Sequence, residues 1–128
     1  MISPLAALAA VLLSTLMVVA DTPEVLDVKT TRSGMGWRID VTLSHPDTGW
    51  DHYANGWEVL DAEGNHIATR ELIHPHVKEQ PFTRSLSNVM VPDGVRVIYI
   101  RARCSLQKDF VGPTIEVPLL DNTVRNDY

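Results

Sequence analysis

Two histidines that flank a proline are the first candidates for chemistry in this 128-residue chain. His74 and His76 stand two positions apart, and a residue before a proline favours extended backbone, so the two imidazoles are predicted to face the same side. Two such imidazoles can share a zinc or copper ion, which needs a third and usually a fourth ligand. The further candidate ligands are Asp51, His52, His66 and Glu79.

The alternative for His74 and His76 is a structural role. Pro75 and Pro81 cannot donate to a ladder of strand hydrogen bonds, so the segment is expected to form an edge or a connection between strands. The imidazoles would then bond backbone groups that the ladder leaves unpaired, and both are expected to be at least partly exposed. This interpretation requires no cofactor.

A second candidate site lies in the loop TGWDHYANGW, residues 48–57. Trp50, His52 and Tyr53 combine aromatic faces with polar groups, a combination that suits a sugar or peptide ligand. The alternative is that Trp50 and Tyr53 cap one end of the fold while Trp57 fills its core.

Signals for catalysis are weak. Neither Ser85 nor Ser87 stands in a G-x-S-x-G turn, and phosphate loops, dinucleotide fingerprints and CxxC pairs do not occur. Cys104, the single cysteine, falls at an inward position of an alternating segment. There it is expected to be a small buried hydrophobe without a neighbouring base. We therefore expect a non-catalytic protein, with a hydrolytic enzyme as a more distant alternative.

The segments that must position these residues follow the two-residue period of β-strands. The side chains predicted to face the core are Trp37, Ile39, Val41, Leu43, Trp57, Val59, Ile98, Ile100, Ala102, Ile115 and Val117, with Leu26 and Val28 from the first segment. Gly64 and Asn65 are expected to supply the positive φ of a hairpin turn. About seven short strands without an amphipathic helix predict an all-β fold of two packed antiparallel sheets.

The C-terminal third carries a resemblance to a known family. LSNVMVPDGVRVIYIRARC, followed by PTIEVPLL, resembles the end of a fibronectin type III or related immunoglobulin-like domain. There a leucine and a P-x-G-type turn lead into a long strand ending in Arg-Ala. The resemblance implies a fibronectin-like or immunoglobulin-like β-sandwich, a fold that does not choose among adhesion, ligand binding and spacing. GWDHYANGWEVLDAEGN with HPHVKEQPFTRSL is also similar to small secreted bacterial proteins of unknown function.

The N-terminal segment predicts export. No charged side chain precedes Asp21, and Val18 and Ala20 suit signal peptidase. The apolar run is shorter than the roughly 20 residues of a membrane helix. We predict a cleaved signal peptide at 1–20, with an uncleaved anchor as the alternative. The predicted β-sandwich domain spans 21–120, and a polar tail spans 121–128.

Charge narrows the class of partner. The formal net charge is −5, and none of it lies in the predicted signal peptide. This argues against nucleic acid and anionic membranes as partners. We expect a secreted or periplasmic binding or interaction module, with a protein or small ligand of the cell envelope as its partner. The alternative is a zinc- or copper-binding periplasmic protein that uses the His74 and His76 segment.

Overall fold

The computed structural model describes residues 22–120, which form seven β-strands and no helix. The strands are β1 (Glu24–Ser33), β2 (Gly36–Ser44), β3 (Ala54–Leu60), β4 (His66–Glu71), β5 (Phe82–Val89), β6 (Val97–Cys104) and β7 (Ile115–Pro118). The predicted signal peptide and polar tail lie outside the described residues, so both stay predictions.

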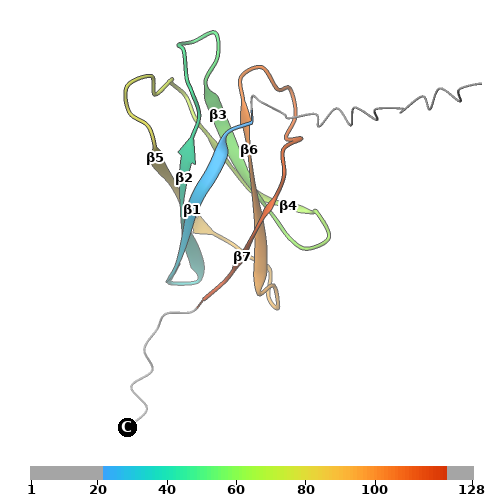
Figure 1. The fold of residues 1–128 in the computed structure, drawn as a ribbon. Helices are drawn as coiled ribbons and strands as arrows, with labels where there is room; N and C mark the ends of the chain where they lie inside the picture. The colour runs from blue at the N-terminus through green and yellow to red at the C-terminus, as the bar shows by residue number, and fades with distance from the viewer. Residues whose placement is uncertain (1–21, 121–128) are drawn as a thin grey trace, which may run out of the picture.

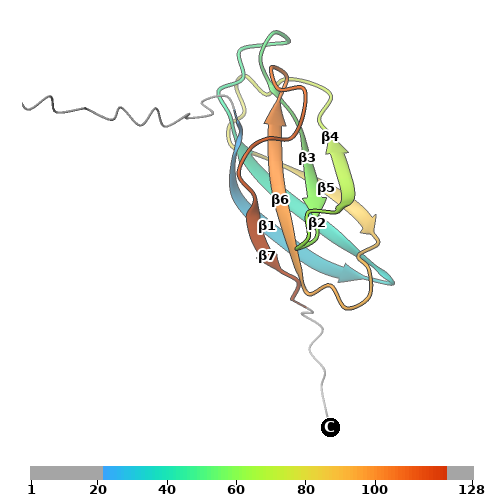
Figure 2. The same ribbon diagram turned by 90° about the vertical axis from the view of Figure 1, so that its right-hand side faces the viewer.

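The strands form two antiparallel sheets that pack face to face (Figures 1 and 2). One sheet has the order β1-β2-β5 and the other has the order β4-β3-β6-β7. The chain crosses between the sheets after β2, after β4 and after β5. The predicted all-β sandwich of about seven strands is confirmed.

The core lies between the two sheets. All but one of the side chains predicted to face inward from β2, β3, β6 and β7 are buried, and Trp57, Ile39 and Ile100 are completely so. The exception is Ile115, which is 37% exposed. It pairs with the buried Ile100 and so shares its face, but it lies at the start of the edge strand β7. There it lines an open gap towards β1.

A bulge in β1 changes the predicted pattern at its start. Val25 pairs with Leu43 and Val28 pairs with Val41, and Leu26 is the extra residue between the two registers. A bulge shifts the alternation by one residue, so Val25 and Val28 pack on the core. The prediction that Leu26 faces inward is wrong, because this side chain is 48% exposed.

The predicted hairpin joins β3 to β4. Gly64 has the expected positive φ of 81°. Asn65 does not, because Asn88 is the only non-glycine residue with positive φ among those described. Asn65 donates its backbone N–H to the Asp61 carboxylate instead, at 2.8 Å.

Three connections meet at one end of the sandwich, at the top of Figure 1. They are the loop after β2 (45–53), the crossing from β4 to β5 (72–81) and the loop after β6 (105–114). The expectation that the His74–Pro75–His76 segment connects two strands is therefore confirmed. Within residues 22–120, no helix is long and apolar enough to cross a membrane.

Candidate metal centre

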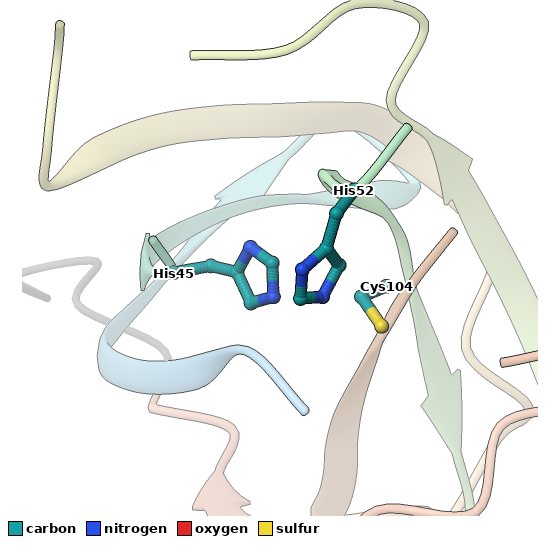
Figure 3. Close-up of side chains that lie close together, drawn as sticks. All are labelled: His45, His52 and Cys104. Atoms are coloured by element: carbon teal, nitrogen blue, oxygen red, sulfur yellow. The ribbon is translucent and has the colours of Figure 1, made fainter. Parts of the chain in front are cut away.

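His45, His52 and Cys104 converge at this end of the sandwich. One ligand atom from each lies within 4.8 Å of the others, and Figure 3 shows the two imidazoles facing each other beside the thiol. His45 directly follows β2, His52 precedes β3, and Cys104 ends β6. In the described part of the chain, this is the one group of three histidine, cysteine or acidic side chains so arranged.

A tight turn holds His52 in place. The Thr48 N–H donates to the His52 carbonyl at 2.9 Å, and the His52 N–H donates to the Gly49 carbonyl at 3.2 Å. Gly49 has a φ of 146°, a conformation that residues other than glycine rarely adopt. The glycine therefore permits the turn that brings His52 back towards His45.

Strand pairing brings Cys104 to the same place. Cys104 lies opposite Ala54 in the β3–β6 ladder. Just beyond the ladder, the Ser105 N–H donates to the Tyr53 carbonyl at 2.8 Å, and the Tyr53 N–H donates to the Ser105 hydroxyl at 3.1 Å. These bonds fasten the loop that carries His52 to the end of the strand that carries the thiol.

The His45 ring is held by a buried carboxylate. Its Nδ1 lies 2.5 Å from Oδ1 of Asp47, and both side chains are almost fully buried. An ionised carboxylate only accepts hydrogen bonds, so Nδ1 carries a proton, and in the neutral ring Nε2 then presents a lone pair. His45 Nε2 is buried and has no hydrogen-bond partner among the described residues.

The cluster has the donors of a transition-metal site. The His45 and His52 ring centroids are 4.7 Å apart, with the ring planes at 84°. Ligand atoms around one tetrahedral zinc ion lie about 3.3–3.8 Å apart, given bonds of about 2.0–2.3 Å. The three ligand atoms lie within 4.8 Å of one another, so a contraction of up to about 1.5 Å would bring them onto one ion. Two imidazoles and a thiolate suit zinc or copper.

The ligand set predicted from the sequence does not converge as a whole. The His74 and His76 ring centroids lie 4.5 Å apart, but neither residue belongs to a convergent group of three ligands among the described residues. Of its members, only His52 belongs to the convergent group. His74, Glu79 and Asp51 are exposed, and Asp51 accepts a hydrogen bond from Thr48 Oγ1 at 3.2 Å. His66, which was also considered, is exposed on β4.

The prediction that His76 is at least partly exposed is wrong, because this residue is only 5% exposed. Its ring stacks on Phe82 with centroids 3.9 Å apart, and its Nε2 lies 2.7 Å from Nη2 of Arg84. Burial, followed by the positive charge of Arg84 and by His74, lowers the pKa of His76. The ring is therefore neutral and accepts the hydrogen bond from Arg84.

The structural alternative for the Trp50 loop, in which Trp50 caps one end of the fold and Trp57 fills the core, holds only in part. Trp57 fills the core as expected, but Trp50 is 70% exposed and does not cap the sandwich. Its ring meets Tyr53 edge to face at 5.7 Å. Binding of a ligand by Trp50, His52 and Tyr53 stays a prediction.

Sequence reasoning missed His45 and Cys104. His45 ends an alternating segment, and Cys104 was interpreted as a buried hydrophobe without a neighbouring base. The burial of Cys104 is confirmed, but two imidazoles lie close to it. The available signal was the pair His45 and His52 at the two ends of one short inter-strand loop, with a cysteine ending a later strand.

Comparisons with known proteins give one partial relative. A protein of Halomicrobium mukohataei described as "Putative lipoprotein" is 40% identical over 68 residues, which is 53% of this chain. The match spans 33% of that protein's length. No family model matches the chain, and no solved structure matches it.

Proposed function

We propose that this protein binds one transition-metal ion through His45, His52 and Cys104. The observation that supports this most strongly is the buried Nε2 of His45, which has no partner while its Nδ1 is bound to Asp47. A buried polar atom without a partner is costly. A metal ion at the point where the three ligand atoms converge would satisfy it.

Zinc or copper is the ion that this donor set favours. Three protein ligands plus one open position is the arrangement of catalytic zinc sites, whereas two histidines and a cysteine in a trigonal array are typical of copper electron-transfer sites. We propose no reaction at the ion. A bound ion would still stabilise the fold by mass action, by about 2.7 kcal/mol at a metal concentration of 100 times Kd.

We further propose that the protein works outside the cytoplasm, in the cell envelope or beyond it. The predicted signal peptide supports this location, and so does the name of the relative. The sandwich fits the fibronectin-like or immunoglobulin-like class, in which a buried tryptophan from a central strand packs between two sheets. Trp57 on β3 occupies such a position.

Thermal melting in the presence of metal tests the proposed site. The untagged exported chain is stripped with a chelator and melted alone, with Zn²⁺ and with Cu²⁺. We expect metal to raise the melting temperature of the wild type. The same addition should leave His45→Ala and Cys104→Ala unmoved. His66→Ala and His74→Ala, which remove exposed histidines, should respond like the wild type.

Two results would contradict the proposal. One is a wild type whose melting temperature ignores both metals. The other is a metal response that survives in Cys104→Ala and disappears in His74→Ala, which would return the site to the segment first predicted from the sequence.

A second candidate function rests on the exposure of Trp50. This large aromatic side chain is 70% exposed, and Leu106, which is 61% exposed, follows the serine that bonds Tyr53. Exposed aromatic side chains at loop ends suit an interaction module. Pull-down from the native envelope fraction with wild type and Trp50→Ala tests this. A partner retained equally by both variants would rule out a role for Trp50.

A further inference from the structure

We propose that Asp47 is the positioning residue for the metal ligand His45, and that the His74–Pro75–His76 segment supports it through the backbone N–H of His76. This inference rests on the proposed function. The His74–Pro75–His76 segment thereby has a role in the site, although neither of its histidines is a metal ligand.

The Asp47 carboxylate accepts hydrogen bonds from three N–H groups. Oδ1 accepts from His45 Nδ1 and from the Ala54 N–H at 2.9 Å, and Oδ2 accepts from the His76 N–H at 2.8 Å. The side chain is fully buried. A carboxylate fixed at three points leaves the His45 ring one orientation and one tautomer, with the lone pair of Nε2 on the side of His52 and Cys104.

The other end of this arrangement is fixed by the His76 ring. Stacking on Phe82 and the bond from Arg84 hold the ring, and the ring holds the backbone from which its N–H reaches Asp47. Gln80 adds a second tie, because its amide donates to the His76 carbonyl and accepts from the His45 N–H, both at 3.0 Å. The crossing between the sheets is thus joined to the metal ligand by two routes.

A carboxylate at this position affects metal affinity as well as stability. A carboxylate behind a metal-bound imidazole fixes the tautomer and raises the basicity of the ligand nitrogen, and its loss typically lowers metal affinity about 10–100-fold. In Asp47→Asn, either orientation of the amide would set its NH₂ against an N–H of Ala54 or His76. With its NH₂ on the side of Ala54, the amide also faces the N–H of His45 Nδ1. Moving the imidazole proton from Nδ1 to Nε2 would relieve that conflict, but it would remove the lone pair that the ion needs.

The experiment combines nitrogen-15 NMR of the histidine rings in the metal-free full chain with competition titrations using Zn²⁺. In the wild type, His45 should be the Nδ1–H tautomer. Asp47→Asn should shift the ring towards Nε2–H and weaken Zn²⁺ binding about 10–100-fold. The control Asp93→Asn, which changes an exposed carboxylate in the connection between β5 and β6, should alter neither result.

His76→Ala tests the support, because it removes the ring and keeps the backbone N–H. We expect a smaller loss of Zn²⁺ affinity than in Asp47→Asn, and no loss in His74→Ala. If Asp47→Asn does not fold, the wild-type tautomer and the His76→Ala titration decide. The proposal is overturned by an Nε2–H tautomer in the wild type, by wild-type affinity in Asp47→Asn, or by equal affinity in His76→Ala and wild type. If the wild type has the Nδ1–H tautomer but binds no metal, the proposed function fails and the placement of His45 by Asp47 stands.

Discussion

Oδ1 of Asp47 lies 2.5 Å from Nδ1 of His45, and both side chains are closed off from solvent. The two residues are separated only by Pro46, so the pair forms locally, at the point where the chain leaves β2. Its consequence is not local, because the opposite nitrogen of His45 is directed at a histidine and a cysteine from other parts of the fold.

Replacing Gly49 should weaken both the fold and the site. Alanine at a φ of 146° is strained, and its Cβ would meet Asp51 Oδ1 at 3.3 Å. We expect Gly49→Ala to lower the free energy of unfolding by about 1–3 kcal/mol and to weaken metal binding. Gly64→Ala, at a φ of 81° in the distant β3–β4 hairpin, is the matched control. It should lose stability in denaturant titrations but keep its metal affinity. Equal metal affinity in both variants would show that the Gly49 turn does not place His52.

Stability should fall in acid because of His76. The pKa of His76 is lowered in the folded protein, so the unfolded chain binds more protons near and below the ordinary pKa of about 6.5. The contribution is present above the unfolded pKa and is lost as the pH falls through and below it. Chemical denaturation with chelator present should show this slope in the wild type and a flatter one in His76→Gln. Parallel pH curves would contradict the assignment.

The Cys104 thiol should be protected in the native state. It is completely buried, and the Cys104 N–H is also held by Gln107 at 3.1 Å. We expect a thiol reagent to react slowly with the native chain, more slowly still after Zn²⁺ is added, and rapidly in denaturant. Fast labelling of the native protein would show that the thiol is open to solvent. Labelling that Zn²⁺ does not slow would argue against Cys104 as a ligand.

A pair of isoleucines that share one face should differ in their contribution to stability. Ile100→Ala should cost about 2–5 kcal/mol, because the side chain is completely buried. Ile115→Ala should cost much less, since its side chain is 37% exposed at the open edge between β7 and β1. Urea denaturation of both variants measures the difference. Equal costs would mean that the edge is closed in solution.

The fold was predictable because alternation is a local property. The two-residue period of β2 and β6 alone identifies the faces that meet in the core. The errors occur where strand pairing or the edge of a sheet overrides the two-residue alternation. Leu26 is turned outward by a bulge, and Ile115 lies beyond the cover of the opposite sheet.

The site was less predictable because it depends on how separate loops meet. His52 was among the candidates, but nothing in the local sequence places it beside Cys104, which is opposite Ala54 only through strand pairing. The backbone N–H of His76 likewise donates to a residue distant in the sequence, Asp47, 29 positions earlier in the chain. The spacing of His74 and His76 was the more visible pattern, yet their contacts are with Phe82, Arg84 and each other.

X-ray absorption at the metal edge, on untagged protein purified from its own compartment, tests the central claim most directly. We predict one equivalent of zinc or copper with one sulfur neighbour and two imidazole nitrogens, for zinc at about 2.3 Å and about 2.0–2.1 Å respectively. The sulfur signal should vanish in Cys104→Ala. A protein without bound metal, or a metal surrounded only by nitrogen and oxygen, would contradict a site built from His45, His52 and Cys104.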